Sequence, residues 1–394
     1  MAIEWVLFFL PVVFILGWLA ARLDIRHIKK NASRLPRAYM TGLSHLVRGE
    51  KDQALDAFIK AQPIAPESFD LRFAIAELSR HRGEHRRALE VHKEISERED
   101  LPDDVRKKAL WELAKDYFNM GFLDYAEHHA TPLMKDKEYH ERALEMMLTI
   151  CQLSGDYRRA LTFSGEFSDS AALFRRVMRA QWHCQCAASL ADDKREEKRK
   201  LLEDALHINN KCARASMMLG NLALAEGRTE EAASYFLSVE RQGSEYLWRA
   251  VEGLVKARTA QGRTDVMHHE VLRWFHAYPS SALFESAYRA FSTLPEGGNS
   301  LAREALLKRL GVTVGMRWID EQSASLTGED RDLWMALRET LRAAAGKRFF
   351  CDNCGYEVDD FFWQCSGCLY WESCRLRENG HISPPKQIGI SFEK

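Results

Sequence analysis

Glycines spaced 34 residues apart restrict the fold of this 394-residue chain more than any other feature. Gly49 and Gly83 are separated by 34 positions, and so are Gly121 and Gly155. An alanine follows five residues after each of these glycines, and the flanking sequence reads as a helix, a short turn and a second helix. A repeat of this length indicates helical hairpins that stack into an α-solenoid, because a single hairpin cannot bury its apolar face alone.

The repeating unit resembles the tetratricopeptide repeat. Its first copy has Gly42 where the paired helices approach closely and Gly49 in the turn. The other matching positions are Ala54, Leu55, Phe58, Ala61 and Pro66 in this copy, and Leu219, Gly220, Gly227, Ala232, Tyr235 and Phe236 in a later one. We expect about seven hairpins between residues 35 and 280, followed by divergent capping helices, so that the array covers residues 35–345.

Three copies depart from this pattern. His92 occupies a position where an aromatic residue is expected, and Asp265–Val271 lacks the alanine. A charged insertion, Leu190–Lys200, is predicted to be a solvated helix face, with a binding arm as the alternative. The first helices of such an array form a concave face that usually holds a peptide or a protein. Aromatic and basic residues that either line this face or pack inside the array are Tyr39, Arg72, Trp111, Tyr117 and Arg179.

Two Cys-x-x-Cys motifs near the end of the chain predict a metal site. Ten residues separate the motifs, whose cysteines are Cys351, Cys354, Cys365 and Cys368. Two residues between cysteines allow a tight turn to aim both thiolates at one point, so two facing turns form a tetrahedral site for one zinc or iron ion. Gly355 is expected to have a positive φ, so that backbone N–H groups turn toward sulfur.

Cys374 and His381 follow the second motif, but four thiolates already complete a tetrahedral site, and we leave both out of the predicted ligand set. A closed four-sulfur site has no open position for water and does not act as a catalytic zinc. The predicted role of the metal is therefore structural or electron-transferring.

The N-terminus predicts a membrane anchor. Residues 2–21 are apolar except for Glu4, with Trp5 and Trp18 near the two ends, and this length is sufficient to cross a bilayer as one helix. A cleaved signal peptide is less consistent, because no Lys or Arg precedes the apolar run. Basic residues are concentrated in the linker at residues 22–34, and the positive-inside rule then places the bulk of the chain on the cytoplasmic side.

Composition argues against two functional classes. The net charge of −1 gives no general attraction to nucleic acid. The sequence contains no Walker A loop, no dinucleotide-binding glycine motif and no Gly-x-Ser-x-Gly motif, so we predict that the protein is not an enzyme. The five cysteines outside the two motifs are irregularly placed, which is consistent with a reducing compartment.

The predicted fold is all-α, apart from a small rubredoxin-like or zinc-ribbon module at residues 346–394. A transmembrane helix at residues 1–21, a tetratricopeptide solenoid and a C-terminal four-cysteine module together resemble the lipopolysaccharide assembly protein B family. The metal motif resembles a shortened rubredoxin, matching it at Phe350, the four cysteines, Gly355 and Tyr356. It departs from rubredoxin in the short stretch between the motifs and in Leu369, which replaces a glycine.

The resemblance implies a function. Members of that family lie at the bacterial inner membrane and restrain lipopolysaccharide synthesis by promoting degradation of the lipid A pathway deacetylase. The implied partners are that deacetylase and the membrane-anchored AAA+ zinc protease, together with the membrane itself through residues 2–21. Two alternatives are a scaffold for other lipopolysaccharide synthesis or export proteins and a rubredoxin-like electron carrier.

Overall fold

The computed structural model describes residues 37–64, 68–165, 173–291, 326–344 and 349–377, with residues 316, 319, 320 and 323 between them. The predicted anchor at residues 2–21, the basic linker at residues 22–34 and His381 lie outside the described residues. None of the helices in the described ranges is long and apolar enough to cross a membrane. Contacts divide the chain into two compact units, Met1–Ile150 and Cys151–Lys394.

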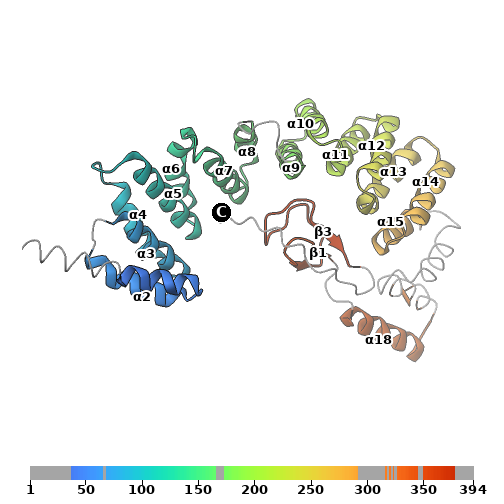
Figure 1. Ribbon diagram of the computed structural model, residues 1–394. Helices are drawn as coiled ribbons and strands as arrows, with labels where there is room; N and C mark the ends of the chain where they lie inside the picture. The colour runs from blue at the N-terminus through green and yellow to red at the C-terminus, as the bar shows by residue number, and fades with distance from the viewer. Residues whose placement is uncertain are drawn as a thin grey trace, which may run out of the picture. The chain divides into compact units, whose positions relative to one another are not determined.

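The first unit consists of paired helices (Figure 1). Residues 37–47 are helical and precede α2. The helices that follow are α2 (Lys51–Ala61), α3 (Phe69–His81), α4 (His85–Ser96), α5 (Asp103–Asn119), α6 (Leu123–Ala130) and α7 (His140–Ser154), with short 3₁₀ turns η1 (Gln62–Ile64) and η2 (Thr131–Lys135).

The second unit continues the pairing from the end of α7. Its helices are α8 (Tyr157–Ser164), α9 (Leu173–Ser189), α10 (Arg195–Ile208), α11 (Ala213–Ala225), α12 (Thr229–Gln242), α13 (Leu247–Ala260), α14 (Thr264–Ala277), α15 (Ser281–Phe291) and α18 (Glu329–Ala344), with η3 (Ser244–Tyr246) before α13. The described helices from residue 37 to Ala277 form seven hairpins, which confirms the number predicted from the repeat.

The turn glycines adopt the left-handed backbone conformation that the repeat requires. Gly49 and Gly83 have φ values of 77° and 84°, and Gly121, Gly155, Gly227 and Gly262 also have positive φ. Close packing explains a second glycine position, because a Cβ on Gly220 would lie 2.7 Å from Cζ of Phe236. The geometry of the hairpins therefore depends on the turn glycines and, at Gly220, on the close packing of a small residue against the ring of Phe236.

The structure decides several expectations about single residues. His92 replaces the expected aromatic residue by stacking on Phe73, with ring centroids 5.8 Å apart, and its Nδ1 lies 2.6 Å from Oδ2 of buried Asp116. Trp111 and Arg72 are buried, so of the two alternatives given for them, packing inside the array is confirmed. The segment at residues 190–194 is a loop, and only the later part of the charged insertion belongs to α10.

A three-stranded antiparallel sheet lies at the end of the second unit, within the module predicted to be rubredoxin-like or a zinc ribbon. Its order is β2-β1-β3, formed by Glu357–Val358, Phe349–Cys351 and Cys374–Leu376. In the register, Cys351 lies opposite Cys374 and Phe349 opposite Val358. Strands of two or three residues are too short for an alternating pattern to stand out, so the sequence predicted the module without locating its individual strands.

Candidate metal centre

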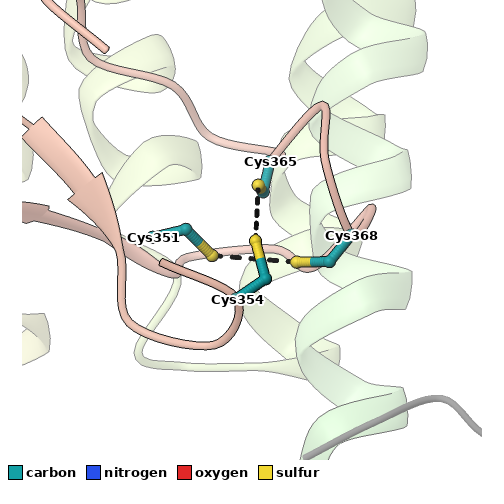
Figure 2. A group of neighbouring side chains, drawn as sticks. All are labelled: Cys351, Cys354, Cys365 and Cys368. Carbon is teal, nitrogen blue, oxygen red and sulfur yellow. Dashed lines mark hydrogen bonds between the residues drawn. The ribbon is translucent and has the colours of Figure 1, made fainter. Parts of the chain in front are cut away.

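The structure brings the four predicted cysteines together at one point. The Sγ atoms of Cys351, Cys354, Cys365 and Cys368 all lie within 4.8 Å of one another. Figure 2 shows two close pairs, Cys351 with Cys368 and Cys354 with Cys365, each with an Sγ–Sγ distance of 3.7 Å. Four sulfurs at about 2.3 Å from a central ion are about 3.8 Å apart in a tetrahedron. The cluster is therefore compatible with a single metal ion, and the choice between iron and zinc stays a prediction.

The two Cys-x-x-Cys turns share one backbone form. In the first turn, Gly355 N–H donates to the carbonyl of Cys351 at 2.9 Å, and Gly355 has the predicted positive φ of 78°. In the second turn, Leu369 N–H donates to the carbonyl of Cys365 at 2.8 Å, and Leu369 itself has a φ of 59°. Leu369 therefore takes the left-handed conformation of the glycine that it replaces, and the turn keeps its shape at a conformational cost.

Backbone N–H groups point at the sulfurs, as a thiolate site needs. Burial opposes ionisation of Cys351, but hydrogen bonds with Ser373 and from the N–H groups of Cys354 and Asn353 outweigh it, so its pKa lies below the ordinary value. The N–H groups of Cys368 and Gly367 point at Cys365 in the same way, although burial still raises the pKa of that thiol. These N–H groups stabilise the thiolate form of the cysteines, which is the form that binds a metal cation.

Cys374 is a neighbour of the cluster and not a member of it. It lies in β3 opposite Cys351 and is buried, and the four-cysteine cluster does not include it. Burial raises the pKa of the Cys374 thiol to about 11, so it stays protonated at neutral pH. Cys374 thus stays outside the group of four cysteines that the sequence predicts as metal ligands.

Aromatic rings attach the metal module, residues 349–377, to the helices of the second unit. The ring of Trp363 lies 5.1 Å from that of Tyr246, and the ring of Phe361 lies 5.7 Å from that of Trp248. Trp248 also stacks on Phe349 at 6.0 Å. Tyr246 ends η3 and Trp248 belongs to α13, so the aromatic half of the docking surface is formed by one helical segment.

A polar half of the docking surface involves residues that the sequence did not single out. Trp371 Nε1 donates to Gln152 Oε1 at 2.9 Å, and Gln364 Nε2 approaches the same oxygen at 3.3 Å. Tyr157 donates its hydroxyl hydrogen to Gln364 at 3.1 Å. No motif marks a glutamine on α7 as a partner of a tryptophan 219 positions later, so only the folded structure identifies this contact.

A buried carboxyl group on the module completes these polar contacts. Glu372 Oε1 accepts a hydrogen bond of 2.6 Å from Gln181 Nε2 on α9. Burial raises the pKa of Glu372, and the hydrogen bond from Gln181 opposes this rise. Together the contacts reach α9 and α13, the first helices of their hairpins. In the second unit, the inner face that the sequence predicted as a groove is thus partly covered by the chain's own C-terminal module.

The chain is similar to known proteins along most of its length. A tetratricopeptide repeat family model matches residues 199–246. Over 395 aligned positions the chain is 26% identical to "Lipopolysaccharide assembly protein B" of Haemophilus influenzae, covering 96% of this chain and 99% of that relative. The chain is a homologue of lipopolysaccharide assembly protein B. The resemblance predicted from the sequence is confirmed.

Lipopolysaccharide assembly protein B of Escherichia coli (strain K12) is 23% identical, over 95% of this chain and 98% of the relative. Because the two alignments leave only a few per cent of this chain uncovered, they include both the repeats and the four-cysteine segment. Among solved structures, Naa15/Naa10 bound to HypK-THB is similar over 82% of this chain and 48% of that chain, with 14% identity and a TM-score of 0.49. That score supports no conclusion about function.

Proposed function

We propose that this protein is a non-enzymatic adaptor of lipopolysaccharide synthesis at the bacterial inner membrane. It promotes degradation of the lipid A pathway deacetylase by the membrane-anchored AAA+ zinc protease. The observation that carries the proposal is the similarity to lipopolysaccharide assembly protein B over 96% of the chain. A helical-repeat array next to a four-cysteine cluster supports a binding role, because such arrays usually hold a peptide or a protein and a closed four-sulfur site has no open position for water.

In this proposal the parts of the chain have separate tasks. The apolar segment at residues 2–21 keeps the adaptor beside a membrane-bound protease, which raises the local concentration so that weak contacts suffice. The repeats present the deacetylase. An exposed apolar patch at the turn from α5 to α6 is a candidate contact in the first unit, since Phe122 and Tyr125 are 51% and 58% exposed.

The metal module has a structural task, which is to hold the inner face of the second unit in one arrangement. Three strands of two or three residues cannot bury a core of their own, so a bound ion and the docking contacts hold the module in place. The docked module then fixes the inner face of the second unit in one arrangement. Loss of the ion is expected to release this face and thereby to change which protein surfaces the adaptor offers.

The decisive experiment measures the half-life of the lipid A pathway deacetylase after translation is blocked. Cells carry the intact protein, no protein, the Cys354→Ser variant or the Cys374→Ser variant. Cys374→Ser is the matched control, because this cysteine lies in the same module but outside the cluster. Expression of the two variants is equalised before the measurement.

The proposal predicts fast decay of the deacetylase with the intact protein and with Cys374→Ser. Slow decay is expected without the protein and with Cys354→Ser. An unchanged half-life in all four strains contradicts the adaptor role. The repeats would then serve as a scaffold for other lipopolysaccharide synthesis or export proteins, and co-purification of such proteins would be the next measurement.

A further inference from the structure

Three arginines occupy the same position in three successive repeats of the second unit. Arg179, Arg214 and Arg249 are spaced 35 residues apart on α9, α11 and α13, and a fully buried alanine follows each of them. These are the first helices of their hairpins, and α11 packs against both α9 and α13. Figure 1 shows them on the side of the second unit that faces β1 and β3. Equal register on neighbouring helices therefore places the three arginines in one row along the inner face.

Contacts with the metal module show where two of these side chains point. The guanidinium of Arg214 lies 5.7 Å from the ring centroid of Trp363, and that of Arg249 lies 5.8 Å from the same centroid. Arg249 also lies 4.7 Å from the ring centroid of Phe361. Both rings belong to the module docked on the inner face, so both arginines point to that face. Arg249 is exposed, and Arg179 and Arg214 are partly exposed, so the row is open to a ligand.

The positive charges of the row have no acidic partner among the described residues. No carboxylate there forms an ion pair with Arg179, Arg214 or Arg249. Arg214 donates to neutral oxygens, those of Gln181 at 3.2 Å and of Gln185, and the buried Nε of Arg179 has no hydrogen-bond partner. Burial lowers the pKa of Arg214, and burial together with the charge of Arg214 lowers the pKa of Arg249. An anionic ligand would relieve this strain between like charges.

Two acids near the row have other partners. Glu372 of the module accepts the hydrogen bond of 2.6 Å from Gln181. Glu252 follows Arg249 by three positions on α13 and accepts a hydrogen bond of 2.7 Å from Lys256 Nζ. Neither acid forms an ion pair with an arginine of the row. Their charges reduce the potential along the row, but they leave guanidinium N–H groups available to a ligand.

The spacing of the row selects a linear ligand. Helices that pack side by side lie about 8 to 10 Å apart. A peptide in the polyproline II conformation rises about 3.1 Å per residue with three residues per turn, so every third side chain points the same way, about 9 Å further along. An acid at every third position would therefore meet one arginine each, and a guanidinium binds a carboxylate through two parallel N–H groups. The row ends at α13, because the position 35 residues after Arg249 is the buried Phe284.

We propose that Arg179, Arg214 and Arg249 bind an extended acidic segment of another protein, with an aspartate or glutamate at every third position. A polynucleotide is a less suitable polyanion, because the net charge of −1 gives the chain no general attraction to nucleic acid. Because Arg214 and Arg249 contact Trp363, the docked module fixes two of the three arginines in place. The proposal concerns the chemistry of the bound segment and does not depend on the adaptor function.

The test measures peptide binding to the full-length protein in phosphatidylcholine nanodiscs, by fluorescence anisotropy at low ionic strength. The probe is a labelled peptide of Asp-Ser-Ser repeats. One comparison peptide has the same composition with its aspartates contiguous, and the other has asparagine in place of aspartate. The probe is expected to bind saturably and the contiguous peptide several times more weakly. The asparagine peptide is expected not to bind, because it lacks the charge that the arginines recognise.

Substitutions test the three arginines. Arg179→Gln comes first, because Arg179 has no hydrogen bond or ion pair with the described residues of the module. It is expected to weaken binding of the probe about fivefold, as the loss of one charge-assisted contact does. Arg179→Lys keeps the charge and is expected to retain most of the affinity. Arg179→Gln combined with Arg249→Gln is expected to weaken binding about 25-fold, since α11 separates the two sites and their effects should multiply.

A matched control keeps the loss of charge apart from the loss of the site. Arg263→Gln removes an exposed arginine next to α14, outside the row, and is expected to leave binding unchanged. Limited proteolysis within residues 349–377 checks whether Arg249→Gln leaves the module docked. If the module is released, the result for Arg179→Gln decides, because that arginine has no such contact with the module.

Four results overturn the proposal. The first is the absence of saturable binding of the probe. The second is binding that Arg179→Gln leaves unchanged or that Arg263→Gln weakens equally. The third is equal affinity for the spaced and the contiguous peptide, because the row would then not match the ligand. The fourth is binding of a single-stranded oligonucleotide, sensitive to the same substitutions, in a protein that does not bind the probe, because this would assign the row to nucleic acid.

Discussion

The helical hairpins and the metal module are stabilised in opposite ways. A hairpin such as α11–α12 is held by residues close in sequence, where the ring of Phe236 packs against Gly220. The module depends on four cysteines around one point and on contacts such as that between Gln152 and Trp371, which are 219 positions apart. Each hairpin is therefore stabilised by the same kind of local packing between its own two helices. The module, in contrast, has strands too short to bury a core of their own, so we expect it to depend on a bound ion and on the surface on which it docks.

Metal removal should separate the two regions most clearly. A chelator under reducing conditions is expected to unfold residues 349–377 and leave the hairpins helical, since structural zinc contributes about 10 kcal/mol or more in small zinc-binding peptides. Hydrogen exchange measured segment by segment checks this result. Protection of β1 and β3 should fall sharply while protection of α5 and α11 stays the same. Retained protection of the strands without metal would show that docking alone suffices.

A substitution inside a hairpin should have the second largest effect. It should destabilise the helices and leave the metal module with its ion. Gly220→Ala places a methyl group 2.7 Å from Phe236, so the ring or a helix must shift, at a cost of about 1 to 3 kcal/mol. Thermal unfolding of the helices checks this cost, and the metal content is expected to stay at one ion per chain. Gly165→Ala is the control, because its nearest neighbour would be a carbonyl oxygen at 3.5 Å. Equal stability of the two variants would contradict close packing at Gly220.

Removal of a single hydrogen-bond donor should weaken the docking of the metal module on the helices. Trp371→Phe removes the Nε1 donor to Gln152 and is expected to weaken docking by about 1 kcal/mol, the usual net contribution of one hydrogen bond. Limited proteolysis within residues 349–377 should become several times faster, while the ion stays bound. An unchanged cleavage rate would mean that the aromatic contacts alone hold the module.

The smallest expected effect is a gain in stability. Leu369 has a φ of 59°, so Leu369→Gly relieves a left-handed conformation that costs about 1 kcal/mol in a residue with a side chain. The midpoint of metal-dependent unfolding in denaturant should rise slightly. Glu372→Gly provides a contrast, because Glu372 has a φ of 56° but also accepts the hydrogen bond from Gln181. A loss of stability at Leu369 would show that its side-chain contacts outweigh the strain.

The sequence predicted what depends on local chemistry. The turn glycines and the close approach at Gly220 follow from spacing, and the four cysteines follow from the geometry that two residues between thiols allow. The sequence analysis did not identify Gln152, Tyr157 and Gln181, because a polar residue that binds a distant segment belongs to no repeating pattern in the sequence. It also placed Trp111 in a possible groove, since an aromatic residue on a first helix looks the same whether it faces a partner or the core.

The order of the parts along the chain has a consequence for synthesis. Tyr246 and Trp248 emerge from the ribosome about one hundred residues before Phe361 and Trp363, and domains generally fold as they emerge. The helices therefore form first, with an aromatic inner face that stays open until Phe361 and Trp363 have been translated and can dock. A chain that terminates early leaves these rings uncovered, and exposed rings of this kind are what chaperones and proteases recognise. Docking of residues 349–377 thus reports that translation has passed the second pair of cysteines.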